Sequence, residues 1–122
     1  MSFVKGTIAL VLLVVAISKV ESIRTENGNQ IVTLGTFAAA DVTCLTKRIY
    51  RFQPDPQTIT FISTTNINWI RVSRINQHAK SGISAPITGG ALGTPQVTLT
   101  IEDTANKNYF LNDVLVVMRC AA

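Results

Sequence analysis

Histidine is almost missing from this chain of 122 residues, since His78 is the only one. Hydrolases with a Ser–His–acid triad depend on a histidine that accepts and returns a proton. His78 lies in the polar stretch from Asn76 to Gly82, which indicates a solvated loop, and Ser81 is its one nearby nucleophile. No serine has the G-x-S-x-G surroundings of a nucleophile elbow. We therefore predict that the chain has no catalytic residues and is not an enzyme.

Cysteine is scarce as well, and its spacing excludes the usual zinc motifs. Cys44 and Cys120 are the only two, with no C-x-x-C and no histidine at a metal-ligand spacing. We therefore predict no metal, and the sequence indicates no other cofactor. An even number of cysteines in an oxidising compartment predicts a disulfide between Cys44 and Cys120. Two separate buried thiols, or a disulfide between chains, remain open alternatives.

Two further classes of site are missing. A phosphate-binding P-loop needs Gly-Lys-Ser/Thr at the start of a helix, whereas the glycines of segment 89–93 are followed by Thr94-Pro95 and an expected strand. Acid–base chemistry needs two carboxylates that converge on one cleft. Glu102 and Asp103 are adjacent, so a strand directs them to opposite faces. Asp55 lies between two prolines, where a role in a turn is the simpler interpretation.

Long apolar runs are also absent, with one exception at the N-terminus. Lys5 is followed by twelve uncharged residues, 6–17, which match the apolar core of a signal peptide and are too few to span a bilayer. Small side chains before the cut predict cleavage between Ser22 and Ile23, which gives a signal peptide, 1–22, and one domain, 23–122. A membrane anchor or a buried helix is the alternative. Cleavage lowers Lys+Arg from 11 to 9 and Asp+Glu from 7 to 6, so the net charge becomes +3. We expect an extracellular, secreted protein whose mature chain does not span a membrane.

Residues typical of β-strands dominate the rest of the chain. Val, Ile and Thr make up 32 of the 100 residues from Ile23 onward, and these β-branched side chains suit a pleated sheet. The sequence predicts an all-β fold, a small antiparallel sandwich or barrel-like domain of about six to seven strands. The expected strands are 30–37, 48–52, 57–63, 67–75, 83–88, 96–102 and 109–119. A hairpin turn is expected at Thr65-Asn66, and the alanines of segment 37–45 indicate one possible helix.

Basic residues lie near aromatic ones in two places, which raises the possibility of a nucleic-acid or anionic-glycan site. The two groups are Lys47, Arg48, Tyr50, Arg51 and Phe52, and then Trp69, Arg71 and Arg74. Such a site needs cations and aromatic rings on one exposed face. Arg71 and Arg74 have opposite parity, so we expect solvated arginines and aromatic side chains packed in the core. Nucleic acid is therefore not an expected partner. Lys47-Arg48 also matches a dibasic processing site, although the start of a strand is the preferred interpretation.

Several segments resemble a known family. They are Ile59-Thr60-Phe61-Ile62, then Asn68-Trp69-Ile70-Arg71-Val72, the glycine-rich 87–93, Val97-Thr98-Leu99-Thr100-Ile101, and the closing strand Val114–Met118. Over roughly 47–118 the chain resembles the insect multiprotein bridging factor two family, which includes salivary secreted peptides and pathogen-response gut proteins. The resemblance implies a short secreted chain and supplies no catalytic residues.

Together these features predict a secreted non-enzymatic insect protein, of saliva, gut or haemolymph. It would be a binding or host/pathogen-response factor that recognises an unknown protein or surface ligand through loops on a β scaffold. The first alternative is a coactivator that bridges transcription factors, which the family name suggests and an intracellular chain retaining 1–22 would favour. The second is a small secreted hydrolase, against which the missing acid–base set argues.

Overall fold

The computed structural model describes residues 30–122, and the predicted cleavage site between Ser22 and Ile23 lies outside the described residues. All regular elements of the described part are antiparallel strands of one seven-stranded sheet, which confirms the all-β expectation. From residue 30 onward, no helix capable of crossing a bilayer is present. The strands are β1 (Ile31–Gly35), β2 (Val42–Ile49), β3 (Gln57–Arg74), β4 (Ile83–Ser84), β5 (Ile87–Gly90), β6 (Thr94–Asp103) and β7 (Val114–Cys120).

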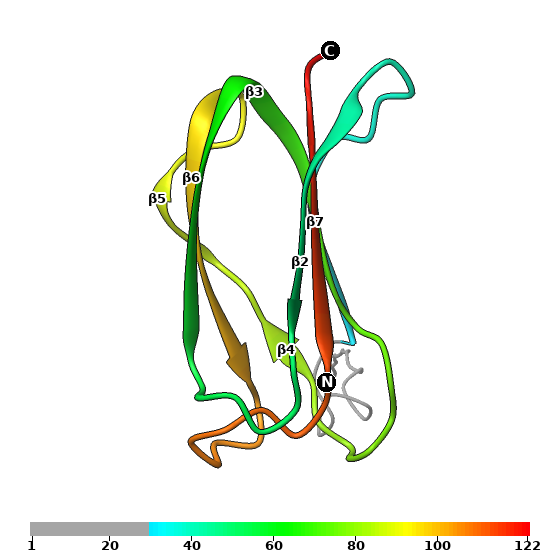
Figure 1. Ribbon diagram of the computed structural model, residues 1–122, viewed down its shortest axis with the longest axis vertical. Helices are drawn as coiled ribbons and strands as arrows, with labels where there is room; N and C mark the ends of the chain where they lie inside the picture. The colour runs from blue at the N-terminus through cyan, green and yellow to red at the C-terminus, as the bar shows by residue number, and fades with distance from the viewer. Residues whose placement is uncertain (1–29) are drawn as a thin grey trace, which may run out of the picture.

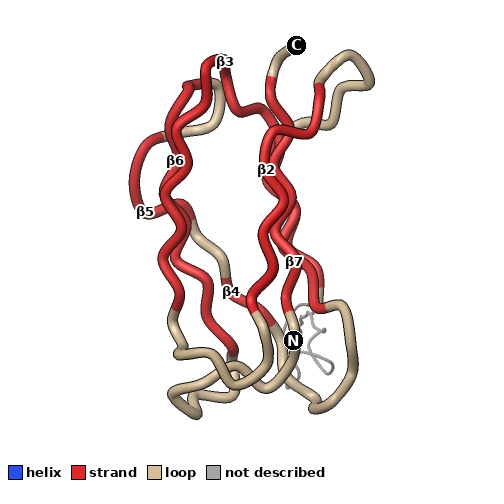
Figure 2. The backbone as a smooth tube through the Cα atoms, viewed as in Figure 1, coloured by secondary structure: helices blue, strands red, loops and turns tan. Residues whose placement is uncertain are grey.

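The long strand β3 belongs to both halves of the sheet. Its first part, from Gln57 to Ile62, pairs with β6, which in turn pairs with β5 and β4. Its last part, from Ile67 to Arg74, lies between β1 and β7, and β7 pairs with β2. Between these two parts β3 bends and passes from one half of the sheet to the other, so that the two halves face each other as two layers (Figures 1 and 2).

The expected hairpin at Thr65-Asn66 is wrong, because β3 continues through it. Ile67 is paired with Thr94 of β6 and also with Cys120 of β7, so the strand changes partner at this point. Polar groups at this point form hydrogen bonds with the backbone just after β7. The Thr65 hydroxyl donates to the carbonyl of Ala121 at 2.6 Å. The N–H of Ala121 donates to the Asn66 carbonyl at 2.9 Å. The residues that indicate a turn therefore occupy the crossing from one layer to the other.

Other expected boundaries also change. The possible helix at 37–45 is wrong, since its second half begins β2 and pairs with β7. Cross-strand pairing of β-branched residues outweighs the helix propensity of three alanines. Of the expected strand 48–52, only Arg48 and Ile49 belong to β2, and a turn follows; 109–119 becomes a strand only from Val114. The expected strand 83–88 is divided at Ala85-Pro86 into β4 and β5, because proline cannot donate to a ladder. Part of the glycine-rich segment, Gly89-Gly90, belongs to β5.

The core lies between the two layers and is filled by alternate residues of the strands. Val97, Leu99 and Ile101 of β6 face inward, as their alternation predicts, and each is fully buried. Phe110, at 0% exposure, is the largest fully buried side chain and comes from the loop before β7. The remaining buried apolar residues are Ile49, Ile59, Ile67, Ile70, Val72, Ile83, Ala85, Val114, Val116, Met118 and Cys120.

Candidate functional site

The register of β2, β3 and β7 gathers arginines on one outer face. Trp69 of β3 is paired with Arg119 of β7, and Arg71 of β3 with Val117. Arg48 of β2 is paired with Leu115, so the three partners are alternate residues of β7. The intervening residues of β7 are buried, so this alternate set faces away from the core. The paired segments of β1, β2, β7 and the end of β3 contain no Asp or Glu. We call the face that carries Arg48, Trp69, Arg71 and Arg119 the arginine face.

Aromatic rings alternate with the guanidinium groups on the arginine face. Phe37 meets Trp69 edge-on, with 5.3 Å between ring centroids. The guanidinium carbon of Arg71 lies 5.7 Å from the centre of the Trp69 ring, and that of Arg119 lies 4.4 Å from the centre of the Phe37 ring. Cations over aromatic faces attract the ring quadrupole, so these contacts hold both partners in place.

Phe37 reaches the arginine face because Arg119 holds the loop that carries it. The Arg119 guanidinium donates to the carbonyls of Ala38 and Asp41, both in the loop between β1 and β2. Asn68 of β3 donates from its side-chain amide to the Asp41 carboxylate at 3.3 Å. Arg119 of β7 therefore holds backbone carbonyls of the loop, and Asn68 of β3 holds the side chain of Asp41 in the same loop.

The expectation that the aromatic side chains pack in the core is wrong for the residues near the arginines. Trp69 is only half-buried, whereas Phe37, Tyr50 and Phe52 are 57%, 56% and 62% exposed. The alternation of side chains along β3 puts Trp69 on the opposite face from Ile70 and Val72, which are both fully buried. Parity also separates Arg71, which is exposed, from Arg74, which donates to the carbonyls of Ala79 and Ser81.

At its other end the arginine face carries an ion pair. Arg48 donates to the carboxylate of Asp113 and also lies 5.0 Å from the centre of the Tyr50 ring. The hydrogen bond from Arg48, with a second from the N–H of Arg51, holds the pKa of Asp113 below its ordinary value of 3.8. The ionised carboxylate therefore joins β2 to the loop that precedes β7.

A pH-dependent contribution to stability follows from that lowered pKa. Because the folded pKa of Asp113 lies below the unfolded one, its stabilisation is present above pH 3.8 and is lost as the pH falls toward the folded value. Asp113→Asn should lower the melting temperature at neutral pH, and the difference from the parent protein should shrink as the pH falls through 3.8. Thermal melts at a series of pH values test this. A difference that does not change with pH would contradict it.

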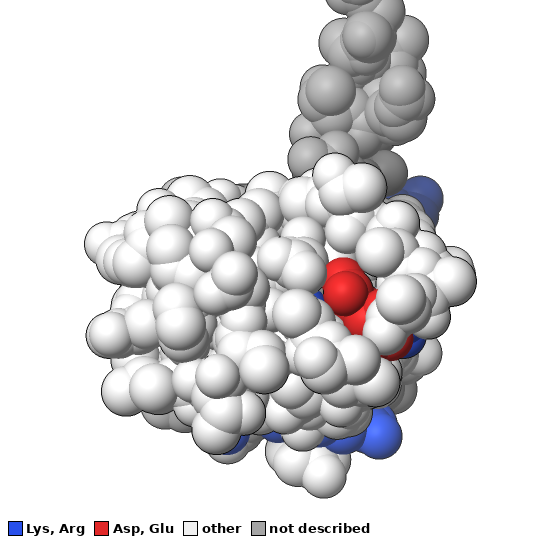
Figure 3. Space-filling view, turned by 90° about the horizontal axis from the view of Figure 1, so that it is seen from above, with Lys and Arg blue, Asp and Glu red and all other residues white. Residues whose placement is uncertain are grey.

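The outer face of the other layer is rich in threonine, and it carries the exposed Glu102 at the end of β6. Thr60 of β3 lies opposite Thr98 of β6, with 3.0 Å between their hydroxyl oxygens, and Thr88 of β5 lies 2.9 Å from Thr100 of β6 in the same way. Thr58 is paired with Thr100 from the other side. In Figure 3 the surface at the far left, over β5 and β6, shows no charged atoms, whereas acidic and basic atoms lie toward the right and along the lower edge.

The residues considered for catalysis do not assemble into a catalytic set. His78 is exposed, whereas Ser81 is 3% exposed and donates its hydroxyl to the Asp103 carboxylate at 3.1 Å. Asp103 also accepts the N–H groups of Ala105 and Leu111. No hydrogen bond joins His78 to Ser81 or Asp103 in the described part of the chain. The buried carboxylate therefore organises loops, and the serine beside it is inaccessible to a substrate.

The carboxylates separate as the alternation of β6 predicts. Glu102 is exposed and Asp103 is 4% exposed, on opposite faces. Asp55 accepts the backbone N–H of Asp103 at 3.1 Å. Burial raises the pKa of Asp55, although that hydrogen bond opposes the shift. Sequence reasoning missed the interior role of Asp103, yet its parity with Ile101, a core residue, was the available signal.

A hollow of about 390 Å³ opens at the end of the molecule beside the loop that carries Phe37. Its lining includes the Asp41 carboxylate and the Asn68 amide, and Figure 3 shows acidic atoms in a hollow on this end. Between residues 30 and 122, no three His, Cys, Asp or Glu residues are grouped so that they could hold a metal ion. The remaining lining residues are Gly35, Thr36, Ala38, Leu92 and Gly93.

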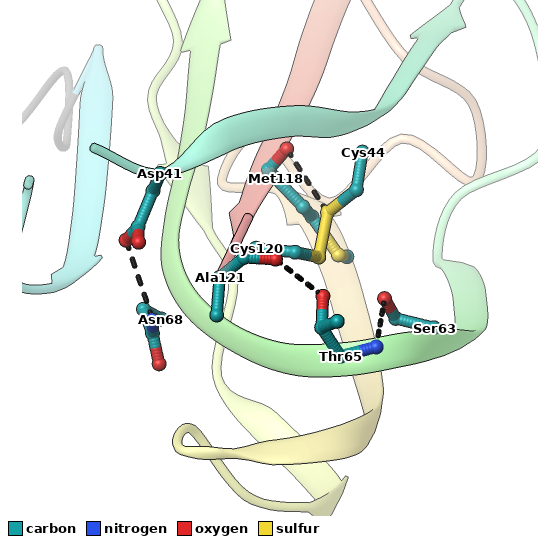
Figure 4. Close-up of a disulfide and its surroundings, with 8 residues drawn as sticks. All are labelled: Asp41, Cys44, Ser63, Thr65, Asn68, Met118, Cys120 and Ala121. Atoms are coloured by element: carbon teal, nitrogen blue, oxygen red, sulfur yellow. Dashed lines mark hydrogen bonds between the residues drawn. A yellow bond between two sulfur atoms is a disulfide. The ribbon is translucent and has the colours of Figure 1, made fainter. Parts of the chain in front are cut away.

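A disulfide joins the two strands beside this end. Cys44 of β2 and Cys120 of β7 are bonded, with 5.8 Å between their Cα atoms (Figure 4). The register of β2 shifts between Thr43 and Leu45, so the ladder accommodates Cys44 as an extra residue. The pairing within one chain, one of three readings left open by the sequence, is the one that the structure adopts.

Comparison of the chain with protein-family models, with curated proteins and with solved structures finds no match. The resemblance to the insect multiprotein bridging factor two family therefore stays a prediction.

Proposed function

We propose that this chain is a secreted, non-enzymatic binding protein that recognises an anionic partner through the arginine face. The observation that carries the proposal is the register that places Arg48, Arg71 and Arg119 on one face, without an acidic residue in the paired segments. The family resemblance supports saliva, gut lumen or haemolymph of an insect as the place of action, in a host or pathogen response. The disulfide between Cys44 and Cys120 supports an oxidising compartment.

The arginine face offers three kinds of contact to such a partner. Arg71 is exposed, and within residues 30–122 its guanidinium lies over the Trp69 ring and makes no ion pair, so its donors can reach an anion. Trp69 and Phe37 present partly exposed rings, on which the apolar face of a sugar or a side chain can stack. Arg48 adds positive potential, although Asp113 neutralises part of it. Sulfated or carboxylated polysaccharides carry both the anionic groups and the apolar sugar faces that these contacts need, and we propose them as the partner class.

Binding to heparin, a soluble sulfated polysaccharide, tests the proposal. Arg71→Glu should weaken binding about fivefold or more, because reversal of one exposed charge changes the free energy by about 1 kcal/mol. The salt concentration needed for elution from a heparin column should fall accordingly. Lys107→Glu is the matched control, because it makes the same charge change in an exposed turn away from the arginine face.

The two variants separate a specific face from a general charge effect. Arg71→Glu should weaken binding much more than Lys107→Glu, and Trp69→Ala should weaken it without any change of charge. Equal losses for both charge variants would show that only the net charge matters. Absence of binding by the parent protein at low salt would refute an anionic partner of this class.

A further inference from the structure

The first part of β3 forms an exposed edge of the sheet. Residues Gln57 to Ile62 pair with β6 on one side, and no described strand pairs with their other side. An unpaired edge presents a row of backbone N–H and C=O groups, which form a template for one further strand. The only occupant that satisfies this whole row is therefore another extended segment of polypeptide.

This edge lacks the protection that β2 and the edge formed by β4 and β5 have. The stretch 57–65 contains no charged residue and no proline, and it is rich in Thr and Ile. On the edge strand β2, Lys47 lies opposite the buried Val116, so the lysine side chain leaves the strand on the face that is turned toward the core. The register shift at Cys44 also interrupts the regular hydrogen bonding of β2. Pro86 interrupts the edge formed by β4 and β5. Inward charges, bulges and prolines are the usual devices that prevent pairing between sheets.

We propose that two copies of this chain associate edge to edge, by antiparallel pairing of Gln57–Ile62 with itself about a two-fold axis. This association is independent of the arginine face. A two-fold contact is self-complementary, and an uncharged strand pairs with its own copy without like-charge repulsion. The arginine faces belong to the other layer of each copy, so the positive charges of the two molecules do not lie at the joint.

The side chains at the joint suit a copy of the same strand. With the axis at Thr60, the two Thr60 side chains lie opposite each other and repeat the Thr60–Thr98 pairing that already exists across β3 and β6. Ile62, which is 68% exposed, would then lie opposite Thr58 of the second copy and lose part of its contact with water. The two threonine-rich faces would then become one continuous surface, with Glu102 of each copy at the end of β6.

Sedimentation velocity of the full secreted protein, measured across a range of micromolar concentrations, tests the proposal. The parent protein should sediment as a dimer, and Thr60→Lys should sediment as a monomer, because two lysines would then face each other at the axis. Thr98→Lys is the matched control, since it places the same charge on the same face but on β6, away from the edge. This control should remain a dimer, and circular dichroism verifies that both variants fold.

Hydrogen exchange identifies what covers the edge. Amides within 57–62 should exchange more slowly as the concentration of the parent protein increases, and Thr60→Lys should abolish that dependence. A parent protein that stays monomeric at every concentration would overturn the proposal. Slow exchange of this edge in a monomer would assign it instead to another segment of the same chain, which also overturns it. Equal dissociation by Thr60→Lys and Thr98→Lys would indicate contact through the threonine-rich face rather than the edge.

Discussion

Replacement of Cys44 and Cys120 by alanine together is expected to lower the free energy of unfolding by about 4 kcal/mol. The disulfide encloses a long loop, with a sequence separation of 76, and a cross-link over a loop of this length removes much of the chain entropy of the unfolded state. Alanine is chosen because Cys120 is 1% exposed, where a serine hydroxyl would be buried. Small domains have total stabilities of roughly 5–15 kcal/mol, so the loss would be a large share.

Urea unfolding of the parent protein and of the double variant measures this effect. A reducing agent should destabilise the parent protein by a similar amount and leave the double variant unchanged, which separates loss of the bond from loss of the sulfur atoms. Without the bond, the end of β7 retains the hydrogen bonds of Ala121 to Thr65 and Asn66. If unfolding midpoints of parent and variant coincide, the disulfide does not hold the fold together.

Replacement of Asp103 by alanine should cost about 3 kcal/mol. Its carboxylate accepts the Ser81 hydroxyl and the backbone N–H groups of Ala105 and Leu111. Removing the acceptor leaves these donors without partners in a site where Ser81 and Asp103 are almost inaccessible to water. A buried donor left unsatisfied costs about 1–3 kcal/mol, and water entering the vacated space offsets part of the sum.

Glu102→Ala is the control for this variant, because Glu102 is the adjacent acid on the exposed face of β6. Its effect should stay within about 0.5 kcal/mol, as is usual for surface substitutions. Asp103→Asn should lie between the two, because the amide keeps one acceptor oxygen and turns an NH₂ group toward the remaining donors. Equal stability of Asp103→Ala and Glu102→Ala, measured by urea unfolding, would show that the buried hydrogen bonds contribute little.

The alternation of apolar and polar residues was a reliable guide wherever a strand has one buried face. In β6 it correctly placed Val97, Leu99 and Ile101 in the core and Glu102 on the surface. The same rule places Asp103 on the buried face that Ile101 occupies, although Asp103 is an acid. The rule succeeds because side chains of a strand point to alternate faces wherever the strand goes.

Turn and helix signals were less reliable, because they describe only a few neighbouring residues. Thr65-Asn66 has the composition of a hairpin turn, but β3 passes through it while it exchanges β6 for β7 as its partner. The choice between reversing and continuing depends on strands that arrive from elsewhere in the chain. The alanines before Val42 favour a helix locally, but pairing of β2 with β7 decides the conformation of the residues that follow them.

What the sequence alone determined is therefore the all-β class, the faces of the individual strands and the availability of two cysteines for one disulfide. These follow from β-branched composition, from side-chain alternation and from an even cysteine count, which are local or compositional properties. Only the tertiary structure decided that Arg48, Arg71 and Arg119 share one face, because three strands distant in sequence must first pair in a particular register. It also decided that the first part of β3 lies at an edge, since an edge is defined by the strands that are not beside it.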